Sequence, residues 1–287
     1  MSPYVKIGMI YLLIFTSLFC QAEQSKPLWE YGFGIAHLRF EQYPSSDQYS
    51  SLNIPFPTFQ YRGEVFRADD QEGARAYLVK EAFYSLEFTG GGTPPVKSDN
   101  NTARQGMSNI PLIAMLGPQL VVKIIPGLEF KLSALQAIST DFQMTRFAGQ
   151  VYESKFDFRY NTETRHSGRL QLTLSNASKE FLSHFYEVEA HQTTADRQIY
   201  STKPGYYATE LSYFHSIDFE KLTYYIGTTL NNYSNSSNRE SPLFKTSQSI
   251  NYLIGFTYLL GESERRAVPE DAGDGLFEKI RRRTHPL

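Results

Sequence analysis

The stretch PLWEYGFGIAHLRFEQY, from Pro27 to Tyr43, decides the fold class because its side chains alternate between two different kinds. One set of alternate residues is large and apolar: Trp29, Tyr31, Phe33 and Ile35. The set between them is small or polar: Glu30, Gly32, Gly34 and Ala36. Successive side chains of a β-strand point to opposite faces. We therefore expect a strand whose apolar face contacts lipid and whose bare face lines a barrel interior.

The same alternation recurs along the chain and predicts about twelve strands. The expected ranges are 28–40, 52–61, 64–68, 76–88, 111–124, 127–138, 150–160, 168–176, 180–191, 205–216, 220–231 and 247–260. After residue 22, no segment reaches the roughly 20 consecutive apolar residues that a membrane helix needs. A closed barrel is then the structure that pairs every backbone group within hydrocarbon. The sequence predicts an all-β protein, an antiparallel transmembrane β-barrel of about 10–12 strands with a short C-terminal periplasmic tail.

The connections between the expected strands alternate in length. The segments at 89–109, 191–205 and 232–245 are long and polar, whereas those at 124–129 and 216–221 are tight. Outer-membrane barrels have long loops outside and short turns in the periplasm. The pattern therefore favours the outer membrane of a Gram-negative bacterium.

Residues 1–22 have the features of a secretory signal peptide. Lys6 is the single charge before the apolar run 7–19, and Cys20, Gln21 and Ala22 form a candidate cleavage site. The alternative is an N-terminal membrane anchor. We expect a barrel over 23–260 and a tail over 261–287, disordered or forming a short helix. Cys20 is the single cysteine, which excludes an internal disulfide framework.

The tail contains one segment with a candidate docking role. A short helix there places Leu276, Phe277 and Ile280 on one face, beside a basic cluster. The possible partner-docking residues are Leu276, Phe277, Ile280, Arg281, Arg282 and Arg283. The alternative interpretation is a disordered periplasmic extension.

No catalytic, cofactor or metal site is indicated. Hydrolytic outer-membrane barrels place His and Ser two residues apart, and no histidine here has Ser at that spacing. The pairs His166-Ser167 and His215-Ser216 are adjacent, so their side chains point to opposite faces. The acids Asp69, Asp70 and Glu72 suit a solvated turn better than a calcium loop. The net charge of −2 gives no case for nucleic acid. We expect a non-enzymatic protein that needs no cofactor.

Charged residues inside the expected strands have a predictable direction, because charge at membrane depth prefers the lumen over lipid. These residues are Arg39, Glu81, Glu87, Lys123, Glu129, Lys131 and Arg169. They predict either ion pairs that fill a narrow barrel, which we favour, or the selectivity lining of a pore.

Four segments, taken in order, resemble the MipA/OmpV family of outer-membrane proteins. Residues 28–69 resemble the opening of the family, with an aromatic-glycine first strand, a Tyr/Ser/Asp turn, a Pro-containing second strand and then Tyr-Arg-Gly. The second segment, 103–120, carries Arg104, Gly106, Met107 and Gly117, and the others are 184–206 and 241–245. The resemblance covers most of residues 28–260. The chain departs from the pattern at its end, where about 27 residues follow the final strand.

This resemblance implies a barrel without catalytic residues. One branch of the family is a scaffold that holds a periplasmic murein transglycosylase and a murein synthase together, and another is porin-like or adhesive. We therefore expect a non-enzymatic scaffold for murein-synthesising and lytic enzymes at the periplasmic face, in contact with outer-membrane lipid. The alternatives are a small-solute porin or channel and a surface adhesin.

Overall fold

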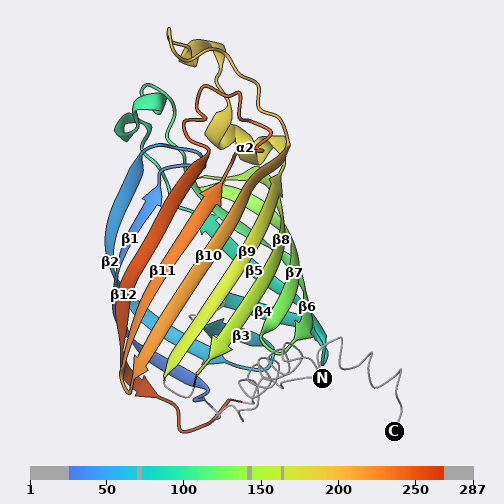
Figure 1. Ribbon diagram of the computed structural model, residues 1–287, viewed down its shortest axis with the longest axis vertical. Coiled ribbons are helices and arrows are strands. Elements are labelled where there is room, and N and C mark those ends of the chain that lie inside the picture. Colours follow the sequence, from blue (N-terminus) through green and yellow to red (C-terminus); the bar gives the residue numbers. More distant parts are fainter. Residues whose placement is uncertain (1–25, 70–72, 141–143, 163–164, 268–287) are drawn as a thin grey trace, which may run out of the picture.

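The computed structural model describes residues 26–69, 73–140, 144–162 and 165–267, and they form a closed antiparallel barrel (Figure 1). Neighbouring strands follow one another in chain order, and β12 closes the ring by pairing with β1. The first six strands are β1 (Trp29–Glu41), β2 (Tyr49–Arg62), β3 (Phe66–Asp69), β4 (Gly73–Lys80), β5 (Tyr84–Thr93) and β6 (Leu112–Ile125). The others are β7 (Leu128–Thr140), β8 (Thr145–Asn161), β9 (His166–Ala177), β10 (Gly205–Phe219), β11 (Leu222–Asn232) and β12 (Gln248–Glu262).

The two faces of β1 lie as the alternation predicts. Trp29, Tyr31, Phe33 and Ile35 are exposed on the outer surface, and Gly32, Gly34 and Ala36 are buried inside. The bare inner face makes room for side chains of β2: a Cβ added at Gly34 would lie 2.7 Å from the Phe56 ring. A Cβ added at Gly32 would lie 2.1 Å from the Tyr258 carbonyl oxygen of β12. Glycine at these positions therefore permits close approach of both neighbouring strands.

An apolar belt surrounds the barrel. Large apolar side chains on the outer face of strand after strand are about half exposed, as surfaces in contact with lipid are. Aromatic rings gather toward the strand ends near the termini, where Trp29 lies 5.9 Å from Tyr31 and Phe33 lies 5.9 Å from Tyr258. Amphipathic rings suit the boundary between hydrocarbon and water. This belt confirms the sequence prediction of a membrane barrel.

The two ends of the barrel differ. At one end, tight connections such as 126–127 and 220–221 join successive strands, and both ends of the described chain lie there (Figure 1). We call this the turn end. At the opposite end, the connections 42–48, 94–111, 178–204 and 233–247 are longer, and we call this the loop end. The alternation of long and short connections is as predicted.

Two of the predicted strands are wrong. Residues 180–191 were expected as a strand, but they contain the helix α2 (Lys179–Tyr186) and the short 3-10 turn η3 (Ala190–Gln192). The apolar residues fit a helical period, because Phe181, Leu182, Phe185 and Tyr186 fall on one face. The expected strand 76–88 is two strands, β4 and β5, joined by a turn in which the Glu81 N–H donates to the Tyr84 carbonyl oxygen at 2.9 Å.

Several predicted features lie outside the described residues. These are the signal peptide over 1–22, the acids Asp70 and Glu72, and the tail segment with Leu276, Phe277, Ile280, Arg281, Arg282 and Arg283. Within the described part of the chain, no helix has the length and apolar character needed to cross a membrane.

Candidate functional site

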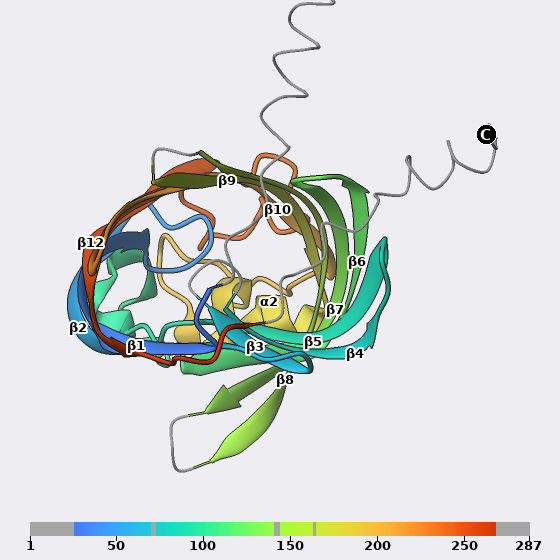
Figure 2. The same cartoon turned by 90° about the horizontal axis from the view of Figure 1, so that it is seen from below.

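The loop end of the barrel is filled by a hydrophobic core, which we call the cap. Each of the four long loops contributes buried side chains to it, and the strands below contribute small or apolar ones. Figure 2 looks along the barrel from the turn end and shows α2 within the outline of the ring. The buried loop residues of the cap are Tyr43, Val96, Met107, Ile110, Phe181, Leu182, Phe185, Tyr186, Val188, Tyr233 and Leu243.

Helix α2 forms the centre of the cap. Ser178 caps its N-terminus by accepting a hydrogen bond from the Phe181 N–H at 3.5 Å, a favoured role for serine. The buried rings of Phe181 and Phe185 meet edge to face with centroids 5.4 Å apart. Such aromatic contacts add to the stabilisation from burial. The helix is therefore held by packing, since eight residues are too few for stability alone.

Hydrogen bonds join loops that are far apart in sequence. The Tyr186 hydroxyl donates to the Pro44 carbonyl oxygen at 3.0 Å, and the Tyr43 hydroxyl donates to the Leu243 carbonyl oxygen at 2.8 Å. The Ser241 hydroxyl donates to the Tyr186 carbonyl oxygen at 2.8 Å. Burial raises the pKa of the Tyr186 phenol well above its ordinary value, so the phenol keeps the proton that it donates. Three of the four long loops thus form one bonded unit.

Two arginines tie the 94–111 loop to the other loops. Arg104 donates to the Phe185 carbonyl oxygen at 3.2 Å, and its guanidinium lies 5.6 Å from the centre of the Tyr43 ring. Burial lowers the pKa of Arg104 to about 10, which still leaves it charged at neutral pH. Arg197 donates to the Ala103 carbonyl oxygen at 2.8 Å and to the Gln105 carbonyl oxygen at 3.1 Å. A guanidinium can bridge several carbonyls because it carries five N–H donors.

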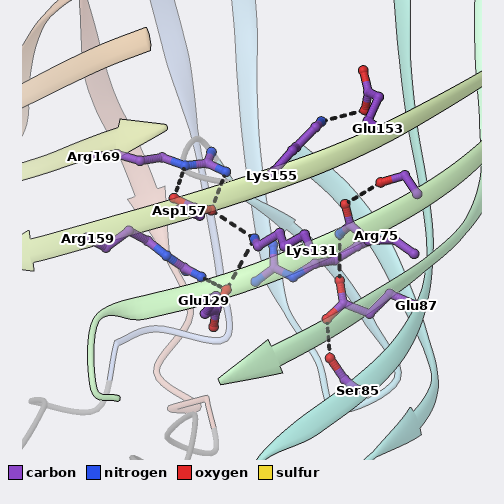
Figure 3. A network of polar contacts seen from close by, with 12 residues as sticks. Arg75, Ser85, Glu87, Glu129, Lys131, Glu153, Lys155, Asp157, Arg159 and Arg169 are labelled. Atoms are coloured by element: carbon purple, nitrogen blue, oxygen red, sulfur yellow. Dashed lines mark hydrogen bonds and ion pairs between the residues drawn. The ribbon is translucent and has the colours of Figure 1, made fainter. Parts of the chain in front are cut away.

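Below the cap, the inner wall over β7, β8 and β9 is charged (Figure 3). Asp157 is fully buried and accepts two hydrogen bonds from Arg169, at 2.8 and 2.6 Å. Lys131 lies between two acids, 2.9 Å from Asp157 and 3.2 Å from Glu129. Arg159 pairs with the same Glu129 carboxylate. Each carboxylate here has at least one cationic partner, which offsets the cost of burying it.

The charged wall continues toward β5 and β4. The Ser85 hydroxyl donates to Glu87 at 2.6 Å, and Gln119 links Glu87 to Ser133 on β7. A pocket near the turn end adjoins these groups. Its lining residues are Tyr77, Lys80, Glu81, Ser85, Glu87, Val121, Lys123, Glu129 and Arg159. The turn half of the lumen therefore carries this charged network, and the loop half is packed by the cap.

The structure places most of the predicted lumen charges on the inner wall. Glu87, Lys123, Glu129, Lys131 and Arg169 lie there or line the pocket. The ion pairs within the wall agree with the interpretation that we favoured, in which paired charges fill a narrow barrel.

The prediction for two of the charges was wrong. Arg39 lies on the outer face, 3.7 Å from the centre of the Tyr49 ring and beside the exposed Tyr252 ring. Stacking on two tyrosines near the loop end keeps the charge at the edge of the apolar belt. Glu81 lies in the turn between β4 and β5 and is exposed there.

Four charged residues of β8 were missed by sequence reasoning. Glu153, Lys155, Asp157 and Arg159 are alternate residues and all face the lumen. Lys155 pairs with Glu153 at 2.7 Å, and the other two bond to the neighbouring strands. The signal was present in the stretch YESKFDFRY, where charged and aromatic residues alternate.

The adjacent His-Ser pairs point to opposite faces, as predicted. The hydroxyls of Ser167 and Ser216 lie 2.6 Å apart, with Ser216 buried on the lumen side. The rings of His166 and His215 meet on the other face, where Nδ1 of His166 lies 3.1 Å from Nε2 of His215. Neither serine is within reach of the histidine next to it in sequence. The described residues also contain no group of three or more His, Cys, Asp or Glu placed to hold a metal ion.

The chain matches a known protein family. A family model described as MltA-interacting protein MipA matches residues 33–260. The match begins within β1 and ends within β12, so it spans the barrel. No relative is found among curated proteins.

Three solved structures match the chain at low sequence identity. A structure of the NanC porin is 11% identical, with a TM-score of 0.38, over 79% of this chain and 98% of that chain. A bacterial polysaccharide outer-membrane secretin is 10% identical, with a TM-score of 0.33, over 81% and 99%. OmpT of Vibrio cholerae is 11% identical, with a TM-score of 0.24, over 84% and 99%.

Proposed function

Because the chain belongs to the MltA-interacting protein MipA family, we propose that it is a non-enzymatic outer-membrane scaffold for murein enzymes. Its partners are a lytic transglycosylase of the MltA kind, which the family name specifies, and a murein synthase. The barrel lies in the outer membrane of a Gram-negative bacterium, with the loop end outward and the turn end in the periplasm. Murein lies on the periplasmic side, so the turn end is the surface that such enzymes can reach.

The cap is the observation that carries this proposal. Phe181, Leu182 and Tyr186 are essentially inaccessible to solvent, and they fill the loop half of the lumen. For a solute to pass through the barrel, this core must open. Opening would cost the free energy of burial of several aromatic side chains. A barrel closed at its loop end suits a binding role better than transport.

The contact surface comprises the short turns and the C-terminal tail. Among the turns, Val65 is 68% exposed between β2 and β3, and Phe219 is 49% exposed at the end of β10. The tail begins at the same end, since β12 finishes there. The tail residues that we assign to docking are Leu276, Phe277, Ile280, Arg281, Arg282 and Arg283.

Binding of purified MltA to the folded barrel in detergent tests the assignment. Truncation after Ala267 removes residues 268–287 of the tail, including the docking residues, and Val65→Ser alters a turn. We expect each change to weaken MltA binding while the barrel stays folded. Asp196→Ala, in the loop between β9 and β10, is the matched control and leaves binding unchanged. No binding to the unaltered barrel, or undiminished binding after both changes, contradicts the proposal.

A second candidate function is a small-solute channel, and the charged wall favours it. Arg169, Lys131 and Glu129 line a polar surface below the cap, as side chains that select ions do. This function requires the cap to move. Glu129→Gln and Lys131→Met would then shift ion selectivity in opposite directions in a planar bilayer.

A further inference from the structure

The wall of the barrel is incomplete beside β2. This strand has 14 residues, but it pairs with β3 at two positions, Tyr61 with Ala68 and Arg62 with Arg67. The reason is the length of the next strands, because β3 has four residues and β4 has eight. Within the described chain, residues 49–60 of β2 are therefore paired with β1 on one side and with no strand on the other.

The opposite edge of this discontinuity belongs to β5. The pairing of β4 with β5 begins at Arg75 and Thr89, so Gly90–Gly92 pair only with β6. Toward the loop end, the 94–111 segment crosses over, and the Asn101 amide donates to Gln42 at 2.7 Å. We call this place, between residues 49–60 of β2 and 90–92 of β5, the seam. Within the described chain, no strand pairing closes the wall there.

The backbone of β2 shows which groups face the seam. The Arg62 N–H donates to the Leu28 carbonyl oxygen at 2.8 Å, so even-numbered residues direct their backbone groups toward β1. Backbone groups of successive strand residues point to opposite sides, so the odd-numbered residues face the seam. Two of these are Pro55 and Pro57, which have no N–H to leave unpaired. Proline on an open edge also opposes the addition of another strand.

In the middle of this edge, from Ile54 to Pro57, the side chains are apolar on both faces. Phe59 is 62% exposed on the outside, and Ile54 and Phe56 are half-buried on the inside. No charged residue occurs between Tyr49 and Gln60. The inner wall of β8, by contrast, carries four charged residues in succession. The apolar inner patch of Ile54 and Phe56 at membrane depth matches hydrocarbon rather than water.

We propose that the seam admits an acyl chain of a membrane phospholipid, which lies against Ile54 and Phe56 inside the barrel. The prolines at the edge disfavour a β-strand as the occupant. The absence of charge along residues 49–60 disfavours a lipid headgroup, which needs cations and hydrogen-bond donors. The seam opens toward hydrocarbon at the level of Phe33 and Ile35, the partners of Pro57 and Pro55. This inference is independent of the binding of murein enzymes.

Quenching of tryptophan by brominated phospholipid tests the proposal. Trp29 is the single tryptophan, so the Trp29→Phe variant has no tryptophan fluorescence of its own. Phe56→Trp then reports on the seam, and Ile254→Trp on the outer face of β12 reports direct lipid contact. Phe214→Trp, on the inner face of β10 where both neighbouring strands are paired, is the matched control. Each variant is reconstituted in phosphatidylcholine vesicles with bromine midway along the acyl chains.

We expect Phe56→Trp to lose fluorescence to nearly the same extent as Ile254→Trp, while Phe214→Trp loses little. Equal, weak quenching of Phe56→Trp and Phe214→Trp overturns the proposal, because it means that lipid stays outside the wall. If Phe56→Trp does not fold, Ile54→Trp replaces it, with the same two outcomes. Both positions lie on the inner face of β2.

Discussion

The Tyr186 hydroxyl donates a hydrogen bond to the Pro44 carbonyl oxygen at 3.0 Å, across 142 residues of sequence. This contact joins helix α2 to the loop between β1 and β2. Ser241 extends it to the loop between β11 and β12 by donating to the Tyr186 carbonyl oxygen. A single buried tyrosine thus connects three of the four long loops. The closed loop end is therefore a folded unit with its own core.

The cap is expected to loosen in acid because of His184. Burial, and then the charge of Arg104, lower the pKa of His184 below its ordinary value. The folded cap therefore binds a proton less readily than the unfolded loop, so stability is lost as pH falls below about 6.5. Near-ultraviolet circular dichroism of the packed aromatic rings follows this loss. His184→Gln removes this loss in acid, whereas His191→Gln, at an exposed position, retains it.

Asp157 is the residue on which the charged wall depends most. Asp157→Asn removes the negative charge that Lys131 and Arg169 share in a buried site. Removing one partner of a buried ion pair costs about 3–5 kcal/mol. We expect the free energy of unfolding to fall by this amount, as measured by the shift of the denaturant midpoint. Glu153→Gln, which removes a pair at the edge of the wall, is the control with a smaller loss. Equal midpoints for Asp157→Asn and the unaltered chain would show that the wall does not support the barrel.

The close approach of β12 to β1 requires glycine at position 32. Gly32→Ala places a methyl group 2.1 Å from the Tyr258 carbonyl oxygen, so the strands must separate. Overpacking of this kind costs about 1–3 kcal/mol. The heat-dependent shift in gel mobility that reports a folded barrel should start at a lower temperature. Gly91→Ala is the control, since its nearest neighbour would be the Met115 methyl group at 3.8 Å. An unchanged shift for Gly32→Ala contradicts the close approach.

Pro55 and Pro57 keep the open edge of β2 from pairing with other chains. The double variant Pro55→Val, Pro57→Val restores two backbone donors on the seam side, and we expect it to form dimers by strand pairing. Chemical cross-linking of the purified barrel followed by gel electrophoresis measures this. Pro118→Val on β6, which has strands on both sides, should stay at the level of the unaltered chain. A double variant that does not dimerise would mean that something other than proline protects the edge.

The strands were predictable because lipid and lumen impose opposite demands on alternate residues. The stretch from Trp29 to Ala36 shows this plainly, and most strand ranges follow from the same rule. Helix α2 broke the rule, because Phe181 and Phe185 suit a strand period as well as a helical one. The turn at Glu81 was missed because it contains no glycine or proline to mark it.

The cap and the seam could not be predicted in the same way. The cap depends on contacts among Tyr43, Tyr186 and Leu243, which no local pattern connects. The seam exists because β3 and β4 are short. The sequence predicted a brief strand over 64–68 and one long strand over 76–88, so the short β4 was not recognised. Long-range packing decides both features, and propensity and period describe only neighbours along the chain.

The measurement that tests the central claim most directly is single-channel conductance of the refolded barrel in a planar bilayer. The cap is closed in the structure, so the unaltered chain should fold and show no conductance steps. Phe185→Ala removes a buried ring from the cap, at a cost of about 3–5 kcal/mol, and should produce openings. Reproducible conductance steps from the unaltered chain, equal to those of Phe185→Ala, would contradict a closed barrel and favour the channel.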